Sequence, residues 1–147
     1  MISKLLKKNE KGFTLMEMLI VVAIIAVLIA IAIPTFNASL IKARVATDEA
    51  NIRSGYASTM AEVLTENLGE DTTKTGTVKY YLQVDGSVQP EGDKNTNPYK
   101  CVGTPKGAVE IAGQTVNAWA KDNDVSYTYD YSNNKVTINV PGTTTGG

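Results

Sequence analysis

A single uninterrupted apolar run near the N-terminus most constrains what this chain can fold into. From Met18 to Ile33 no residue has a polar side chain, and between residues 13 and 33 the polar residues are Thr14 and Glu17. About 20 apolar residues, with a rise of about 1.5 Å each, make a helix that spans the hydrocarbon layer of a bilayer. We therefore expect a membrane-spanning helix over residues 13–33.

The charges on either side of this run predict its orientation. Four lysines precede it, against the single acid Glu10: Lys4, Lys7, Lys8 and Lys11. Because a positively charged flank stays in the cytoplasm, the C-terminal bulk of the chain is expected on the outer side of the membrane.

Glu17 is the unusual residue of the run. A carboxylate at the centre of a bilayer costs about 2.5–3.5 kcal/mol, and less near the end of a helix, so such a group needs a partner. The sequence has no Lys or Arg between Lys11 and Lys42. A new α-amino group at Phe13, created by cleavage of the chain, could be the missing cation.

The residues around the start of the run resemble a known processing signal. The segment Lys-Gly-Phe-Thr-Leu-Met-Glu at residues 11–17, followed by an apolar helix, is similar to the prepilin signal of type IV pilins and type II secretion pseudopilins. The resemblance implies that a membrane peptidase cuts between Gly12 and Phe13 and methylates the Phe13 amine. It makes Glu17 the assembly glutamate and Pro34 the proline that follows the apolar half of the helix. The direct likeness covers about residues 7–50.

Two other readings of residues 13–33 remain open. The run could be an ordinary signal anchor with Glu17 near its edge by accident. A cleaved secretory signal fits less well, because its apolar region is about 7–15 residues long and is followed by a small-residue cleavage site. Here the run is longer and the small residue Gly12 precedes it.

The helix is expected to begin at or just before Phe13 and to continue well past the membrane. Pro34 removes a backbone donor, which predicts a kink or local break. Beyond it, apolar residues recur at helical spacing and predict an amphipathic half over residues 34–68, with Gly55 as a second soft point and Leu68-Gly69 as the end. The expected stripe is Ile41, Val45, Ile52, Tyr56 and Val63.

Residues 69–147 are expected to form a globular head. A polar loop over 70–76 leads to an apolar segment, 78–84, that fits a strand or a short helix, and 90–98 reads as irregular loop. Period-two alternation then predicts antiparallel strands over 109–111, 116–120, 125–131 and 136–140, with one face packed. The predicted fold is α+β: a long helix packed on a C-terminal antiparallel sheet, with 1–12 as a leader. The resemblance implies the same architecture.

Charge and residue types narrow the possible chemistry. Residues 1–12 carry four Lys and one Glu, so without them 14 Lys+Arg fall to 10 and 15 Asp+Glu to 14, a formal balance of −4. A nucleic-acid binder needs a basic patch, so nucleic acid is not an expected primary partner. The chain has no histidine, which excludes Ser–His and Cys–His catalysis within it. We expect no enzyme activity and no cofactor.

A few residues of the head leave alternatives open. Cys101 is the single cysteine, so no intramolecular disulfide can form, and we expect its thiol to be at least partly buried. Asp122 and Asp124 could ligate calcium, as some pseudopilins do, although three polar residues between strands usually form a turn. Trp119 and the tyrosines of 127–131 could form a binding platform, but the tyrosines fit the core of a sheet better.

These observations predict a structural, filament-forming protein. Its expected partners are further copies of itself, a prepilin peptidase, a pilus assembly platform and the membrane, which it crosses once before it joins an extracellular pilus. Within the family, a minor pilin or a secretion pseudopilin is the alternative. From other classes, the alternatives are a monomeric signal-anchored binding protein and a membrane-tethered enzyme, the latter disfavoured by the missing histidine.

Overall fold

The computed structural model describes residues 12, 14–67, 74–92 and 97–142 of the 147-residue chain. One helix, α1 (Leu15–Asn67), is followed by six strands. The chain divides into two compact units, residues 1–38 and 39–147, so the first part of α1 belongs to one unit and the rest of α1 to the other. Each unit is described by itself.

The bounds of α1 are close to those expected from the sequence. The helix begins at Leu15 rather than at or before Phe13, because Thr14 adopts the capping position. It ends at Asn67, and the expected stop at Leu68-Gly69 lies outside the described residues. The α-helix continues through Pro34 without interruption, so the local break is absent, whereas the kink stays a prediction.

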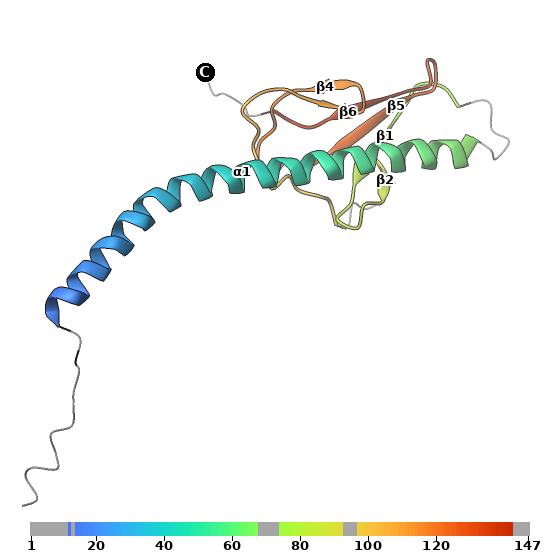
Figure 1. Ribbon diagram of the computed structural model, residues 1–147. Coiled ribbons are helices and arrows are strands. Elements are labelled where there is room, and N and C mark those ends of the chain that lie inside the picture. The colour runs from blue at the N-terminus through green and yellow to red at the C-terminus, as the bar shows by residue number, and fades with distance from the viewer. Residues whose placement is uncertain (1–11, 13, 68–73, 93–96, 143–147) are drawn as a thin grey trace, which may run out of the picture. The chain divides into compact units, whose positions relative to one another are not determined.

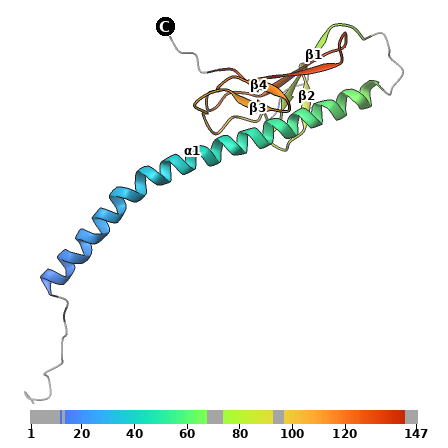
Figure 2. The ribbon, with the colours of Figure 1, turned by 45° about the horizontal axis from the view of Figure 1, so that its top comes forward.

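The second unit contains two antiparallel sheets (Figures 1 and 2). One has four strands in the order β2-β1-β5-β6, and the other is the hairpin β3–β4. In the turn of that hairpin, Ala112 and Gly113 both have positive φ, as a two-residue turn that matches strand twist requires. The strands are β1 (Thr77–Leu82), β2 (Val88–Pro90), β3 (Val109–Ile111), β4 (Gln114–Val116), β5 (Ser126–Asp130) and β6 (Lys135–Asn139).

The predicted α+β class is confirmed, with two differences among the strands. The segment that fits either a strand or a helix is the strand β1, and the short strand β2 was not predicted. It overlaps the expected loop over 90–98 only at Pro90. The strand expected over 116–120 is wrong: β4 ends at Val116, and Trp119 makes only an isolated bridge to Gly142. The alternation around Trp119 suggested that its side chain would face away from the core, but its ring is fully buried. The β3–β4 ladder does not extend to this residue.

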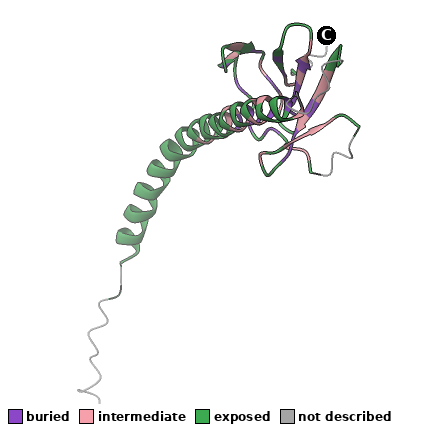
Figure 3. Cartoon of the chain, turned by 90° about the vertical axis from the view of Figure 1, so that its right-hand side faces the viewer, coloured by how far each residue is buried: buried purple, intermediate pink, exposed green. Residues whose placement is uncertain are grey.

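The core lies between the C-terminal half of α1 and one face of the four-stranded sheet. Alternation along β5 and β6 directs Tyr127, Tyr129, Val136 and Ile138 inward, so the prediction that one face packs is confirmed. The expected reading of these tyrosines as sheet core is therefore also confirmed. Figure 3 shows buried residues along the inner strands and exposed residues along the first turns of α1.

The predicted stripe on α1 is correct except at its first position. Ile52 and Val63 are buried, and Val45 and Tyr56 pack partly buried against the core. Ile41 is 47 % exposed, because the head covers α1 only from about Val45, where Gly103 lies against the helix backbone. The amphipathic half therefore has a shorter buried face than the sequence predicts.

Gly55 has a different role from the soft point expected of it. A Cβ atom at this position would lie 2.2 Å from the Tyr127 hydroxyl oxygen and 2.7 Å from Leu82 Cδ1. The same Tyr127 hydroxyl donates a 2.7 Å hydrogen bond to the Ile52 carbonyl. The sheet thus packs closely against the helix at Gly55, where a Cβ atom would collide with Tyr127, so packing requires glycine.

Candidate functional site

The first turn of α1 is closed by two reciprocal hydrogen bonds. The Glu17 amide donates to the Thr14 hydroxyl at 3.2 Å, and the Thr14 amide donates to Glu17 Oε2 at 2.9 Å. This is a capping box, in which two backbone donors that the helix cannot satisfy find side-chain partners. Glu17 also lies in the first turn, where the helix dipole favours negative charge. The sequence-based reading of Glu17 missed this role, although the Thr-x-x-Glu spacing signals it.

Within one copy of the chain, the Glu17 carboxylate has a hydrogen-bond partner. The carboxylate is exposed and has a local partner, so it is not simply an unsatisfied charge in an apolar run. The capping contact uses Oε2, and a carboxylate accepts hydrogen bonds at both oxygens. Glu17 can therefore hold the helix end with one oxygen and still present the other to a cation.

The apolar half of α1 is uncovered within the described residues of the chain. Its large side chains are exposed from Leu15 to Phe36, with Leu19 at 57 % and Leu28 at 60 %. Length and composition make α1 able to cross a membrane, with a mean hydropathy of 3.0 in its most apolar window and none of that window buried. This surface needs lipid or another apolar surface to cover it.

The remaining predicted site residues lie in the first unit. Gly12 is exposed, and a Cβ added to it would meet no atom within 4 Å. Phe13, the expected methylation site, lies outside the described residues. Just after Pro34, the Thr35 hydroxyl donates to the Ile31 carbonyl at 3.0 Å, a contact that tends to bend helices. The structure thus places Gly12 and Glu17 near the start of the helix and Pro34 about five turns further on.

Asp48 is the buried polar residue that sequence reasoning missed. It is fully buried on α1 and accepts four hydrogen bonds from distant parts of the head. The first two reach Oδ1, from the Tyr99 hydroxyl at 2.7 Å and the Val102 amide at 2.9 Å. The others reach Oδ2, from the Gly103 amide at 2.8 Å and Trp119 Nε1 at 3.1 Å.

This arrangement explains why Trp119 is not a binding platform. Its indole ring is buried, and its one donor is already used by Asp48. Gly103 permits the contact, because a Cβ there would lie 2.7 Å from the Val45 nitrogen. The spacing between Val45, Asp48 and Ile52 puts the carboxylate on the buried stripe, a signal that its polar character concealed.

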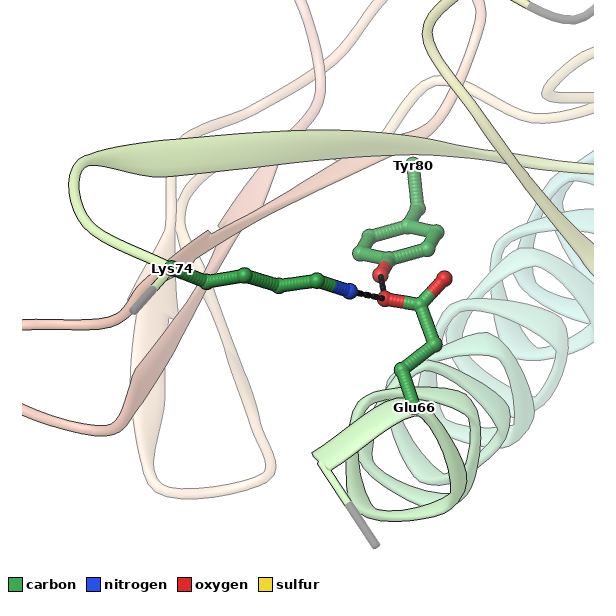
Figure 4. Close-up of polar contacts among 3 residues, drawn as sticks. All are labelled: Glu66, Lys74 and Tyr80. Carbon is green, nitrogen blue, oxygen red and sulfur yellow. Dashed lines mark hydrogen bonds and ion pairs between the residues drawn. The ribbon is translucent and has the colours of Figure 1, made fainter. Parts of the chain in front are cut away.

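The distal end of α1 is tied to the sheet by a second acidic residue. Glu66 Oε2 accepts a hydrogen bond from the Tyr80 hydroxyl at 3.2 Å and lies 3.4 Å from Lys74 Nζ (Figure 4). Burial, together with the nearby Glu66 charge, raises the pKa of the Tyr80 hydroxyl. Because the Lys74–Glu66 pair is partly exposed, it contributes little to stability by itself.

The acidic turn between β4 and β5 has an ordinary structural explanation. Asp124 Oδ1 lies 2.7 Å from Lys100 Nζ, and the Asp122 amide donates to the Cys101 carbonyl at 2.8 Å. Within the described ranges, no three His, Cys, Asp or Glu residues come close enough together to hold a metal ion. The arrangement at residues 122–124 is that of a tight turn.

Cys101 is fully buried, as expected for a lone thiol. Burial raises the pKa of this thiol to about 12, and the nearby carboxylate of Asp48 acts in the same direction. A thiol that stays protonated at neutral pH is a poor nucleophile. Cys101 therefore serves as a small apolar core residue.

Comparisons with known proteins agree with the N-terminal reading. Residues 7–33 match the family model described as the prokaryotic N-terminal methylation motif. The chain is 28 % identical over 137 residues to the fimbrial protein EcpC of Eikenella corrodens, covering 88 % of this chain and 87 % of that protein. It is also 33 % identical over 104 residues to a type IV major fimbrial protein FimA of Dichelobacter nodosus, covering 61 % of this chain and 64 % of FimA. Among solved structures, no significant match to this chain was found.

Proposed function

Because this chain belongs to the type IV pilin and pseudopilin family, we propose that it is the structural subunit of a type IV pilus that supports adhesion, motility or cell aggregation. The observation that carries the proposal is the exposed apolar half of α1, which starts at a capped turn containing Glu17. A helix that is apolar all round is stable either in lipid or in a bundle of like helices. Transfer from one to the other leaves its hydrophobic burial nearly unchanged.

Processing at the start of the helix is the first step of the proposed function. A prepilin peptidase cuts between Gly12 and Phe13 and then methylates the Phe13 amine. The exposure of Gly12 and the open space around it support access by such an enzyme. Before assembly the subunit crosses the cell membrane once, with its N-terminus in the cytoplasm and its head outside.

Assembly by way of α1 is the second step. With the help of an assembly platform, residues 13–33 leave the membrane and pack among the same residues of other copies, while the heads face outward. Glu17 of one subunit pairs with the Phe13 amine of a neighbour and sets the register of addition. Pro34 supplies a joint between the packed half of the helix and the head.

The names of the relatives favour a principal subunit over the alternatives. FimA is named a major fimbrial protein, and its match to this chain supports the same role here. A minor pilin or a pseudopilin would share the N-terminal motif with a major pilin. It would differ from a major pilin mainly in its abundance and in the structure that it builds.

The test combines the intact mass of the protein from cells with microscopy of material sheared from the cell surface. The proposal expects a mass that lacks residues 1–12 and carries one added methyl group, and filaments in which this chain is the main component. Gly12→Val is the matched control, because a bulky residue at the cut should leave the leader attached. Processed protein that is only a trace component of filaments would favour the minor-subunit alternative, and a surface protein that keeps residues 1–12 would contradict the proposal.

A further inference from the structure

The four-stranded sheet of the head has two outer strands, β2 and β6. The free edge of an outer strand presents backbone N–H and C=O groups, and such an edge can pair with a strand of another molecule. This hazard is greatest for a chain whose copies are held close together. The structure shows how each of the two edges is occupied.

The ladder geometry identifies which groups of β6 point outward. The Leu82 amide donates to the Val125 carbonyl, so residues 125, 127 and 129 direct their backbone groups toward β1. The alternate residues, Ser126 and Thr128, direct theirs toward β6, where they face Asn139 and Thr137. By the alternation of an antiparallel ladder, the backbone groups of residues 136 and 138 point away from the sheet.

One side chain of the β3–β4 hairpin meets these outward groups. Gln114 Nε2 donates to the Val136 carbonyl at 2.8 Å, and Gln114 Oε1 accepts from the Ile138 amide at 3.1 Å. A C=O and an N–H that flank one residue are the pair that a single residue of a neighbouring parallel strand would satisfy. The Gln114 carboxamide thus takes the place of one residue of an added strand.

The opposite edge is closed by a different device. The Glu91 amide donates to the Lys79 carbonyl at 2.7 Å, which makes residues 89 and 91 the ones whose nitrogens face β1. The nitrogen of Pro90 therefore faces outward, and proline has no hydrogen to donate. A strand added at this edge would find a missing donor at Pro90, the last residue of this three-residue strand.

The hold of the hairpin on β6 is local. A cavity of about 400 Å³ lies farther along the hairpin, with Val116, Asn139 and Val140 in its lining. The hairpin and β6 belong to different sheets, so no continuous ladder joins them among the described residues, and the two Gln114 hydrogen bonds are polar contacts at this junction.

We infer that Gln114 latches the β3–β4 hairpin over the edge of β6 and so prevents an extended strand from a second copy of this chain from pairing there. Together with Pro90, the latch protects both edges of the four-stranded sheet against an added strand. This inference concerns the head alone, and it stands whether or not the chain forms filaments through α1.

The test uses the full-length chain in detergent micelles, which cover the apolar half of α1. Gln114→Met keeps the size of the side chain but removes both hydrogen bonds, whereas Gln114→Glu keeps an acceptor for Ile138. Thr115→Ala is the control, because its hydroxyl bonds to Glu110 within the hairpin rather than to β6. The measurements are sedimentation velocity over a range of protein concentrations and hydrogen exchange of the Ile138 amide.

At low concentration, Ile138 in Gln114→Met should exchange about tenfold faster than in the unchanged chain, which corresponds to one lost hydrogen bond. As concentration rises, this variant should self-associate and Ile138 should regain protection, while Thr115→Ala behaves like the unchanged chain. Unchanged exchange of Ile138, or faster exchange with no association at any concentration, would overturn the inference. If Gln114→Met does not fold, Gln114→Glu decides by self-association alone, because it loses the bond to the Val136 carbonyl but keeps an acceptor for Ile138. Absence of association of this variant at any concentration would then overturn the inference.

Discussion

The two halves of α1 differ in what covers their apolar side chains, and each contains one informative carboxylate. In the first half, Leu19 is 57 % exposed, and Glu17 has its partner three residues away in the helix cap. In the second half, Ile52 is fully buried, and Asp48 has partners 51 to 71 residues away. An acidic residue in an apolar stripe therefore has two distinct meanings. The Glu17 carboxylate bonds locally through Oε2 and is exposed, whereas both oxygens of Asp48 are used in hydrogen bonds that hold the head together.

The largest effect on stability is expected at Asp48, because the contrast with Glu17 predicts a purely structural role for this residue. Asp48→Ala leaves four donors without their acceptor, two of them backbone amides. Each unsatisfied buried donor costs about 1–3 kcal/mol, so four of them would cost about 4–12 kcal/mol. Because two of the four contacts are only partly buried, the free energy of unfolding should fall by an amount near the lower end, roughly 4–6 kcal/mol. The measurement is urea unfolding of the full chain in detergent, followed by the fluorescence of its single tryptophan, Trp119.

Two further variants make this prediction specific. Asp48→Asn keeps one oxygen acceptor and should cost less than the alanine variant. Glu62→Ala removes an exposed carboxylate from the same helix and should change stability by less than about 0.5 kcal/mol. If Asp48→Ala were no more destabilising than Glu62→Ala, the four contacts would not hold the head together.

Glu17 should show the opposite behaviour, with assembly affected and the head intact. In a filament, the loss of the carboxylate from a pair shielded among packed helices leaves one charge unpaired, at a cost of about 3–5 kcal/mol. Glu17→Ala should therefore be cleaved normally and give few filaments, as counted by electron microscopy. The Trp119 unfolding curve should stay unchanged.

The capping box allows the charge of Glu17 to be separated from its hydrogen bond. Glutamine also serves at this position of a capping box, so Glu17→Gln keeps the bond to the Thr14 amide and loses only the charge. If the charge sets register, Glu17→Gln should assemble as poorly as Glu17→Ala. Normal filaments from Glu17→Gln would instead assign the role of Glu17 to the helix cap.

A smaller effect on the free energy of unfolding is expected at Gly55, where the second half of α1 packs against the sheet. In Gly55→Ala the new methyl group must displace the Tyr127 hydroxyl, at a cost of about 1–3 kcal/mol, partly offset by a helix-propensity gain of about 1 kcal/mol. A net loss of up to about 2 kcal/mol should appear in urea unfolding. Adding Tyr127→Phe makes room for the methyl group, so the double variant should lose less than the sum of the two single changes. Simple additivity would show that the two residues do not press on each other.

The smallest effect concerns pH and again separates the two halves. Burial raises the pKa of the Cys101 thiol to about 12, above its ordinary value of 9.0, and also raises that of the Tyr127 hydroxyl. Above pH 9 the unfolded chain therefore loses protons that the folded head keeps, so stability falls as pH rises, by about 1.4 kcal/mol per pH unit for each such group. Unfolding at pH 8 to 11 measures this slope, and Cys101→Ala should reduce it between pH 9 and 10. A slope unaffected by this change would mean that the thiol is not protected.

The sequence predicted most of the architecture because the strongest signals are periodic. The apolar run, the stripe on α1 and the alternation in β5 and β6 each depend on one element and its burial, so they could be recognised without the partner. Asp48 was missed, and the packing role of Gly55 was not predicted, because both depend on residues that the fold brings beside them. Trp119 was left undecided for the same reason. The cap formed by Thr14 and Glu17 is local and could have been predicted from the Thr-x-x-Glu spacing. From the sequence, only a cation was expected as the partner of Glu17.

The Asp48 contacts also have a consequence for where and when the head can form. They join the helix to the segment around Cys101 and to Trp119 by hydrogen bonds. Hydrogen bonds form and break without electron transfer, so their formation requires no oxidant and no thiol–disulfide exchange. The head should reach the same fold in reducing and oxidising surroundings, and added reductant should leave its unfolding curve unchanged. Folding of the head is therefore expected to be independent of the redox state of the compartment in which it occurs.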